Sequence, residues 1–262
     1  MTPSLWTGLV PAAGRGSRLG FDQPKVLFPV AGRPILEWLL DFLMPTCSRV
    51  VLVLSPSGRQ VVEDYLAGHH PAEYAAGRFR IALQEVPRGM GDAVEVGLQA
   101  VETPHVAIVW GDQVALRRSS VEACLSEHES SPAQPALTFP TLWRERPYIH
   151  FGRDSEGRID SLLQAREGDK MPERGESDTG FFCGRAETVR SLLTELRQAP
   201  AMKGSATEEF NFLPVIPLAA RQGRTILTPS VVTLEETMGV NSREDAAWLE
   251  SYLNKSSVGS TT

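Results

Sequence analysis

Cysteine is scarce in this sequence, which has only Cys47, Cys124 and Cys183 among its 262 residues. The three are widely spaced and no CxxC pair occurs, so we expect neither a disulfide framework nor a structural zinc site. Reduced thiols in an intracellular protein are the simpler interpretation of so few cysteines.

Positive charge and long apolar runs are also lacking. Twenty-six Lys and Arg residues against 32 Asp and Glu give a formal net charge of -6, which argues against a general nucleic-acid or membrane-surface binder. No apolar run approaches the roughly 18 residues of a membrane span, and no signal peptide is visible. We therefore expect a soluble, cytoplasmic protein with no nucleic-acid or membrane partner. No pattern indicates its oligomeric state.

Short apolar runs alternate with amphipathic stretches in the first half of the chain. This alternation is typical of a largely parallel sheet covered by helices, an α/β architecture. Strands are predicted at 5–10, 50–54, 79–84 and 106–110, and helices at 34–44, 58–66 and 91–101.

The second half repeats strands and helices less regularly. Strands are predicted at 136–141, 148–151, 158–163, 181–182 and 225–227, helices at 119–128, 187–196, 210–222 and 243–253, and a polar surface loop at 164–177. We expect one domain over residues 1–253, made of a first half at about 1–115 and a substrate-binding second half at about 116–253. Residues 254–262 are predicted to be a disordered tail.

A glycine-rich segment, PAAGRGSRLG, follows the first predicted strand at residues 11–20. Glycine lets the backbone approach an anion closely, and free backbone N–H groups at such a turn bind phosphate. The dinucleotide-binding pattern GxGxxG and the P-loop pattern GxxxxGK both require glycine at the position of Leu19. The segment therefore fits neither pattern.

Positive charge accompanies these glycines. Arg18 lies within the segment, and Lys25 follows Pro24, whose fixed φ angle pre-sets the backbone before the lysine. A triphosphate carries several negative charges and needs cations and hydrogen-bond donors together. The pattern indicates a nucleoside triphosphate site; a glycine turn with two solvated basic residues is the alternative interpretation.

The longer stretch VPAAGRGSRLGFDQPKVLFPVAGRPILEW, residues 10–38, resembles the signature of the sugar-phosphate nucleotidyltransferases, and most closely that of the uridylyltransferases that make UDP-N-acetylglucosamine. The resemblance implies a GT-A-like, Rossmann-like three-layer α/β domain with a mixed, mostly parallel central sheet. It implies catalytic roles for Arg18, with Arg15, at the β- and γ-phosphates and for Lys25 at the α-phosphorus. The nucleotide-binding residues that it implies here are Ala12, Ala13, Gly14, Arg15, Gly16 and Ser17.

A second segment, LQEVPRGMGDAVEVGL at 83–98, resembles the family pattern QxxxxGTG[HD]A. The match implies that Gln84 and Gly89 read the pyrimidine base, since an amide offers both a donor and an acceptor. Met90 takes the place of the family's threonine and removes a hydroxyl from this nucleotide-binding loop. Without the surrounding segment, Gln84 would be interpreted as a polar residue at the edge of a strand.

Two further segments imply a magnesium site. The apolar run ending in Gly-Asp at Asp112 matches a family strand, and a carboxylate at that end of a strand faces the crevice where open α/β sheets bind ligands. The segment GVNSR near the end resembles the family's GVN[NS]R, which implies that Asn241 is the second ligand of the same Mg²⁺. Two protein oxygens suffice for a magnesium ion that shares its shell with phosphates and water.

The acceptor side matches the family less closely. Asp178 replaces an asparagine that holds the sugar, Gln164 replaces a glutamate that contacts sugar hydroxyls, and His150 lies in a segment where the match is only approximate. We expect all three to bind the sugar phosphate. Their changed charges predict a different hydroxyl pattern or an amino sugar, because a site built from polar contacts discriminates strongly.

Together these segments predict an enzyme that converts an NTP, with UTP favoured, and a sugar-1-phosphate into an NDP-sugar and pyrophosphate by Mg²⁺-assisted in-line attack on the α-phosphate. Two alternatives stay open. One is a cytidylyl- or thymidylyltransferase acting on another phosphorylated sugar or alcohol, and the other is a non-catalytic nucleotide-sugar binding protein. No hexapeptide repeat occurs, so we expect no acetyltransferase activity of the kind that bifunctional family members carry.

Overall fold

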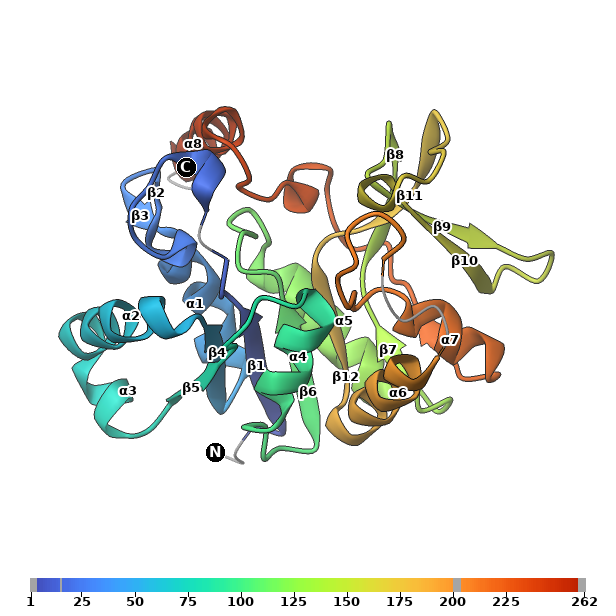
Figure 1. Cartoon of the computed structure of the whole chain (residues 1–262), viewed down its shortest axis with the longest axis horizontal. Helices are drawn as coiled ribbons and strands as arrows, with labels where there is room; N and C mark the ends of the chain where they lie inside the picture. The colour runs from blue at the N-terminus through green and yellow to red at the C-terminus, as the bar shows by residue number, and fades with distance from the viewer. Residues whose placement is uncertain (1–3, 15, 200–203, 259–262) are drawn as a thin grey trace.

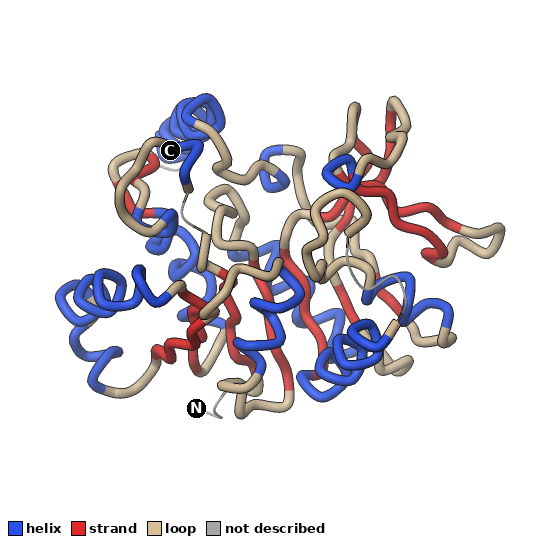
Figure 2. The backbone as a smooth tube through the Cα atoms, in the orientation of Figure 1, coloured by secondary structure: helices blue, strands red, loops and turns tan. Residues whose placement is uncertain are grey.

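The computed structural model describes residues 4–14, 16–199 and 204–258. They form three layers, with helices on both faces of a seven-stranded central sheet (Figure 1, Figure 2). Among the described residues, no helix combines the length and apolar character needed to cross a membrane. The strands of the sheet are β1 (Trp6–Pro11), β4 (Arg49–Leu54), β5 (Phe79–Leu83), β6 (His105–Val109), β7 (Leu137–Thr138), β12 (Phe181–Arg185) and β13 (Ile226–Leu227).

The strand order is β13-β7-β12-β6-β1-β4-β5. Strand β12 is antiparallel to both of its neighbours, β6 and β7, whereas the other pairs of the sheet are parallel. The sheet is therefore mixed and mostly parallel, as the family resemblance implied. Its parallel strands β1, β4 and β6 end at one edge, and the loops after them can converge there on a ligand.

Side chains of the central strands alternate between two apolar cores. On β4, Val50, Leu52 and Leu54 belong to one core and Val51 and Val53 to the other, the period of two expected of a strand buried on both faces. The first core is covered by α1 (Ile35–Thr46), α2 (Pro56–His69), α5 (Arg118–Ser130) and α8 (Arg243–Val258). The second is covered by α4 (Met90–Leu98), α6 (Ala186–Gln198) and α7 (Val215–Arg221).

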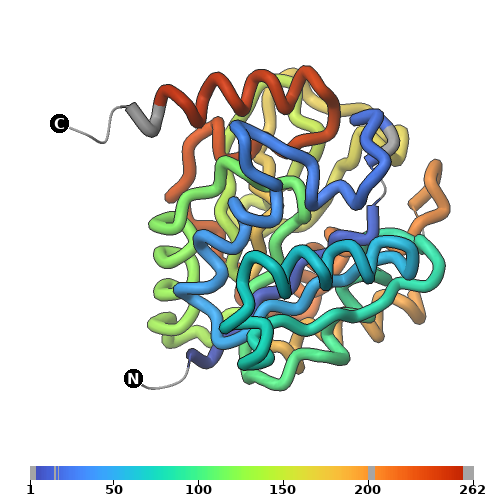
Figure 3. The backbone as a smooth tube through the Cα atoms, turned by 90° about the vertical axis from the view of Figure 1, so that its left-hand side faces the viewer, coloured from blue at the N-terminus to red at the C-terminus, as the bar shows by residue number. Residues whose placement is uncertain are grey.

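Antiparallel strands outside the main sheet form a separate lobe, seen at the upper right of Figure 1. There β8 (Thr141–Glu145) pairs with β11 (Arg174–Asp178), and β9 (Ile149–Arg153) pairs with β10 (Ile159–Gln164). The remaining short elements are α3 (Pro71–Ala75) and a hairpin of β2 (Pro29–Val30) and β3 (Arg33–Pro34). Figure 3 shows α8 lying across the top of the molecule beside the N-terminal loops.

The predicted surface loop at 164–177 is wrong in its second part, because β11 begins at Arg174. Polar composition suggested solvent exposure, but Glu176 is buried and its carboxylate accepts from Thr141 Oγ1 at 2.6 Å and pairs with Arg153 at 2.5 Å. Burial of a charged group requires such partners, and they lie too far along the chain to be recognised from the sequence.

Two helix limits also differ from the prediction. Helix α7 begins at Val215 rather than at Phe210, since Phe210 donates its N–H to Arg88 O at 2.8 Å outside any helix. Helix α8 runs to Val258, whereas the sequence predicted a disordered tail from residue 254; residues 259–262 lie outside the described part. Extending an existing helix requires no new nucleation, so α8 continues past its packed turns.

Candidate functional site

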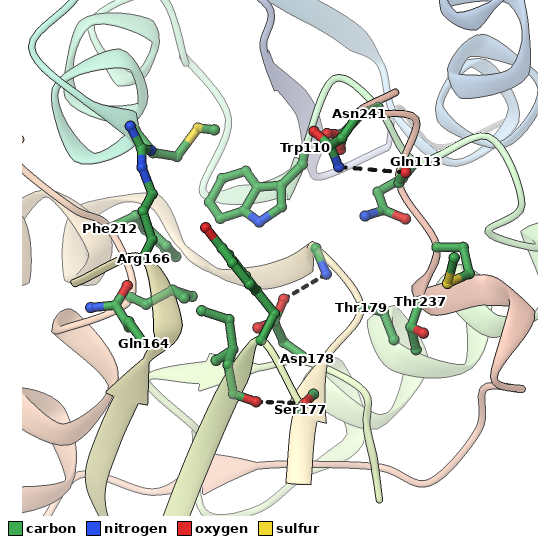
Figure 4. Close-up of a pocket in the computed structure, with 18 of the residues that line it drawn as sticks. Trp110, Gln113, Gln164, Arg166, Ser177, Asp178, Thr179, Phe212, Thr237 and Asn241 are labelled. Atoms are coloured by element: carbon green, nitrogen blue, oxygen red, sulfur yellow. Dashed lines mark hydrogen bonds between the residues drawn. The ribbon is translucent and has the colours of Figure 1, made fainter. Parts of the chain in front are cut away.

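A cavity of about 560 Å³ lies where the loops after the central strands meet the lobe of β8–β11 (Figure 4). Its lining combines residues that follow β6, residues of the lobe, and the segment before α8. The predicted site residues that line it are Arg18, Met90, Asp112, Gln164, Asp178 and Asn241. The cavity therefore brings together positions from both predicted halves of the site.

Lys25 joins two of these residues. Its Nζ donates to Asp112 Oδ2 at 2.9 Å and to Asn241 Oδ1 at 3.2 Å, so one ammonium links three segments that are far apart in the sequence. The Lys25 and Asp112 side chains are only 17% and 19% exposed. The predicted catalytic lysine and the two predicted magnesium ligands thus form one cluster.

Glycines allow this cluster to pack closely. A Cβ on Gly16 would lie 3.1 Å from Lys25 Cβ, and Gly16 has a φ of +62°, where a side chain is strained. A Cβ on Gly239 would lie 3.0 Å from Asp112 Cγ, and the next residue, Val240, donates its N–H to Asp112 O at 3.0 Å. The backbone of residues 239–240 therefore runs directly along Asp112.

The start of α8 is tied to the glycine-rich loop. Arg243 donates through Nε to Leu19 O at 2.9 Å and through a terminal nitrogen to Gly20 O at 3.2 Å. Asp245 accepts from the N–H groups of Asn241 and Ser242 at 3.0 and 2.8 Å, which fixes the turn that presents Asn241. The sequence analysis missed these positioning roles, although both residues belong to or follow the GVNSR segment.

The glycine-rich loop itself follows β1. Ala12 is buried and donates its N–H to Val53 O at 2.8 Å, and Ser17 begins a 3-10 turn, η1 (Ser17–Leu19). Gly14 is exposed, and a Cβ placed on it would meet no atom within 4 Å. Ala13 lies between them and is half-buried, whereas Arg15 lies outside the described residues. Among the residues that the structure describes, none requires glycine at position 14, which leaves room for a ligand.

The predicted base-reading residues lie next to each other. Gln84 is 6% exposed and donates through Nε2 to Gly89 O at 3.1 Å and to Asp92 Oδ2 at 2.9 Å. Two acceptors at one end of the amide fix its orientation, and among the described residues no hydrogen bond to Oε1 is found, so Oε1 can accept from a ligand. Gly89 has a φ of +113°, and a Cβ placed on it would lie 2.6 Å from Phe210 O. This position therefore accepts only glycine.

On the acceptor side, Asp178 and Gln164 line the cavity from the ends of β11 and β10. Asp178 Oδ1 accepts from Gly180 N at 2.7 Å, as drawn in Figure 4. Burial raises the pKa of Asp178 to about 6, with the hydrogen bond from Gly180 acting in the opposite direction. Its carboxyl is therefore poised to titrate close to neutral pH.

His150 is not part of the cavity lining, unlike Gln164 and Asp178, and its predicted role stays a prediction. Its Nδ1 accepts from Glu176 N at 3.1 Å, its ring centroid lies 6.2 Å from that of Trp143, and Gly175 packs against the ring. Side chains alternate along a strand, so the neighbouring Ile149 reaches the cavity instead. The approximate motif match at this segment gave no information on that alternation.

Other polar residues at the cavity were not predicted. Glu167 is 8% exposed, and its carboxylate accepts from the N–H of Thr207, the Thr207 hydroxyl and the Asn211 amide. Burial pushes the pKa of Glu167 upward, but these hydrogen bonds outweigh it and hold the pKa below its ordinary value. The sequence around Glu167 looks like a surface turn and gives no signal of this role. The other unpredicted polar residues of the lining include Gln113, Arg144, Arg166 and Thr179.

The donor set at Lys25 suits a hard cation. Within residues 4–14, 16–199 and 204–258, no group of three or more His, Cys, Asp or Glu side chains forms a metal site. Asp112 Oδ2 and Asn241 Oδ1 nevertheless converge, since both lie within 3.2 Å of one Lys25 nitrogen. Two oxygens of this kind fit a magnesium ion that completes its shell with phosphate and water.

Comparison with known proteins finds relatives along most of the chain. Bifunctional GlmU proteins are 28% identical over 243 residues in Carboxydothermus hydrogenoformans and 30% identical over 252 residues in Trichlorobacter lovleyi. These matches cover 92% and 93% of this chain, but the chain spans only 51% of the length of each relative.

Solved structures share the fold. A UDP-glucose pyrophosphorylase complexed with UDP-glucose matches with a TM-score of 0.74 at 15% identity, covering 95% of this chain and 98% of that one. The 4-diphosphocytidyl-2C-methyl-D-erythritol synthase of Anaerococcus prevotii matches with a TM-score of 0.66 at 12% identity, covering 96% and 99%. The sequence model of the MobA-like NTP transferase domain matches residues 8–178, more than half of the sequence. The chain therefore belongs to the family of MobA-like NTP transferase domains.

Proposed function

We propose that the protein is a sugar-1-phosphate nucleotidyltransferase, which converts an NTP, with UTP favoured, and a sugar-1-phosphate into an NDP-sugar and pyrophosphate. The observation that carries the proposal is the convergence of Lys25, Asp112 and Asn241 beside a cavity of about 560 Å³. The names of the uridylyltransferase-containing GlmU relatives and of the UDP-glucose pyrophosphorylase support the substrate class.

The reaction needs little covalent chemistry from the protein. An oxygen of the acceptor phosphate forms a bond to the α-phosphorus, and the bond from the α-phosphorus to the bridging oxygen breaks, so that pyrophosphate leaves with the electron pair. The acceptor phosphate is already an anion at neutral pH, so no general base is required. Positioning and charge stabilisation supply most of the catalysis in such transfers.

Two cations of the site carry that stabilisation in our proposal. Lys25 holds the charge that accumulates at the α-phosphate, and the cluster with Asp112 keeps its ammonium at one place before substrate binds. Arg18, an exposed residue of the cavity lining, holds the β- and γ-phosphates and the departing pyrophosphate. In our proposal the backbone N–H groups of Ala13, Gly14, Gly16 and Ser17 donate to the triphosphate.

Magnesium is the cofactor that we propose, held by the carboxylate of Asp112 and the amide oxygen of Asn241. When bound, it would supply charge neutralisation at the reacting phosphates. The distances of both oxygens to one Lys25 nitrogen support this assignment.

The choice of base rests on Gln84. Its free acceptor, Oε1, suits the N3–H of uracil or thymine and also the exocyclic amino group of cytosine. A cytidylyl- or thymidylyltransferase acting on another phosphorylated sugar or alcohol therefore remains the second candidate, and the fold of the diphosphocytidyl-methylerythritol synthase favours keeping it. A non-catalytic nucleotide-sugar binding protein is the third.

One assay separates these candidates. Pyrophosphate release is measured with each of the four NTPs, with and without magnesium, against sugar-1-phosphates and phosphorylated alcohols. We expect release with UTP and a sugar-1-phosphate in the presence of magnesium. Release only with CTP or dTTP would establish a cytidylyl- or thymidylyltransferase. Tight binding of an NDP-sugar without any turnover would establish a non-catalytic nucleotide-sugar binding protein.

A further inference from the structure

One wall of the cavity contains buried polar atoms without partners. In the described part of the chain, Arg144 Nε, Gln113 Oε1 and Thr179 Oγ1 are buried and make no hydrogen bond, and all three residues line the cavity. Buried polar groups are almost always bonded, so each exception needs an explanation. Three exceptions on residues that line one cavity single out this wall as a place where a bound ligand, with a small shift of these side chains, can supply partners.

Arg144 stands out among them because it carries a full charge. It lies on β8, and its guanidinium contacts Thr237 Oγ1 at 3.4 Å. Within the described residues it forms no ion pair, in contrast to Lys25, which pairs with Asp112, and Arg166, which pairs with Glu209 at 2.6 Å. A guanidinium remains protonated at any physiological pH, so Arg144 brings a positive charge to the cavity, and this charge acts on Asp178, where it opposes the effect of burial on the pKa.

The acidic groups of the cavity are already engaged elsewhere. Asp112 pairs with Lys25, Glu167 accepts from Thr207 and Asn211, and Asp245 accepts from two backbone N–H groups before α8. Asp178 accepts from Gly180 N, and it forms no ion pair with Arg144 although the charge of Arg144 acts on its pKa. Since no carboxylate of the described residues forms an ion pair with Arg144, its guanidinium can pair with an anionic group of a ligand.

The position of Arg144 assigns this partner to the acceptor. Its contact Thr237 begins the segment that passes Gly239, which packs on Asp112, and reaches Asn241, which contacts Lys25. Figure 4 shows Gln113, Thr179 and Thr237 on one side of the cavity, Gln164 and Arg166 on the other, and Asp178 between them. Arg144 lines the same cavity, and its contact Thr237 precedes Asn241 by four residues along the chain.

We propose that Arg144 binds an anionic oxygen group of the acceptor and is a specificity-determining residue of the reaction. The proposal rests on the proposed nucleotidyl transfer. Gln113 Oε1 and Thr179 Oγ1 complete this subsite by bonding hydroxyl groups of the same acceptor. The anionic group is either the reacting phosphate or a second acidic substituent such as a carboxylate, since both accept paired N–H donors from a guanidinium.

The test compares Arg144→Gln with Arg174→Gln. Arg174 lies on the neighbouring strand β11 and is 66% exposed, so the control removes the same charge from the same lobe without touching the cavity lining. With the acceptor identified by the pyrophosphate-release panel, we expect Arg144→Gln to raise the acceptor KM roughly 10- to 100-fold, the effect of losing a charge-assisted contact. The KM for the NTP and kcat should change by less than about threefold, and Arg174→Gln should change nothing.

Two acceptors distinguish the sources of the anion. If Arg144 binds the reacting phosphate, Arg144→Gln raises the KM equally for a hexose-1-phosphate, whose sugar is uncharged, and for the matching hexuronate-1-phosphate, whose sugar carries a carboxylate. If it binds a second acidic group, only the KM for the hexuronate rises. Arg144→Lys keeps the charge without the planar fork and should recover part of the loss. An unchanged acceptor KM for both acceptors in Arg144→Gln, or in Arg144→Lys should the glutamine variant not fold, overturns the proposal.

Failure of the proposed function gives a different result. If the wild-type chain releases no pyrophosphate with any substrate, the nucleotidyl transfer fails first, before any variant is compared. Inorganic phosphate then serves as the probe, titrated into wild type, Arg144→Gln and Arg174→Gln by calorimetry. Binding that weakens at least tenfold in Arg144→Gln alone supports an anion subsite at Arg144, and equal binding by all three proteins refutes it.

Discussion

Lys25 donates a hydrogen bond to Asp112 at 2.9 Å across 87 residues of sequence. The pair is largely buried, so its attraction is screened less than that of a surface ion pair. In the free protein the carboxylate compensates the lysine, and a triphosphate that binds here must share the ammonium with it. The proposed catalytic lysine and the proposed metal ligand are thus coupled before substrate binds.

The first prediction concerns this lysine. Lys25→Ala should lower kcat by about 10²- to 10³-fold, because a fixed charge at the α-phosphate is lost from a preorganised site. The protein should stay folded, with a cooperative thermal transition. Turnover is measured by pyrophosphate release and folding by circular dichroism.

A matched control is Arg33→Ala. Arg33 pairs with Asp41 at the same 2.9 Å, but both side chains are well exposed and lie away from the cavity. That variant should keep full kcat. Near-normal turnover in Lys25→Ala would remove the lysine from the mechanism.

The second prediction separates two kinds of glycine. A Cβ on Gly14 meets no atom within 4 Å, so Gly14→Ala should change the free energy of unfolding by less than about 0.5 kcal/mol. The added methyl should instead crowd the triphosphate and raise the KM for the NTP. Urea unfolding and initial-rate kinetics measure the two effects.

Gly89→Ala should behave in the opposite way. Gly89 has a φ of +113°, and the added Cβ would lie 2.6 Å from Phe210 O. We therefore expect Gly89→Ala to lower the free energy of unfolding by about 1–3 kcal/mol. If Gly14→Ala proved equally destabilising, the open space at Gly14 would have a structural role rather than a ligand-binding one.

Much of this fold could be predicted from local sequence. The runs that became β1, β4, β5 and β6 are apolar and short, which is the pattern of strands buried on both faces. The family resemblance predicted Arg18, Asp112 and Asn241 at one site, and they line one cavity.

The acceptor half could not be predicted to the same degree, because its order depends on contacts between distant polar residues. Glu176 with Arg153, and Glu167 with Asn211, are buried through partners that no local pattern reveals. His150 shows a second cause: whether a strand residue faces the cavity depends on register, and a shift by one residue reverses it. Arg144 escaped notice because a charged residue on a strand suggests a solvated face.

The third prediction concerns acid stability. His128 is 5% exposed, and its Nδ1 lies 2.9 Å from Thr138 Oγ1. Burial, aided by the nearby His105 and Arg185, lowers the pKa of His128 to about 4 from 6.5. As the pH falls, the unfolded chain therefore binds this proton at a higher pH than the folded protein does. The stability that neutral His128 contributes is fully present above pH 6.5 and is lost as the pH falls from 6.5 towards 4.

This loss should reach on the order of 3 kcal/mol at pH 4, at about 1.4 kcal/mol for each unit of pKa shift. Urea unfolding at several pH values measures it. His128→Gln should flatten the dependence between pH 4 and 6.5, whereas His69→Gln, at the exposed end of α2, should leave it unchanged. If the free energy of unfolding varied with pH in the same way in His128→Gln and in wild type, the acid sensitivity would come from other groups.

The fourth prediction concerns Asp178, whose pKa burial raises to about 6 from 3.8. Here the folded protein holds the proton more tightly than the unfolded chain. Stability therefore falls as the pH rises from about 4 to 6, and the penalty stays constant at higher pH. Asp178→Asn removes the charge while its amide oxygen can still accept from Gly180 N.

We expect Asp178→Asn to raise the free energy of unfolding by about 1–3 kcal/mol at pH 7.5 and to leave it unchanged below pH 4. A charged group that a protein retains at such a cost is typical of a functional site. The acceptor KM of the wild type should accordingly vary between pH 5 and 7, and that of Asp178→Asn should not. A variant that is no more stable than wild type at pH 7.5, with an unaltered pH profile, would mean that the carboxyl is well solvated and titrates at its ordinary pKa.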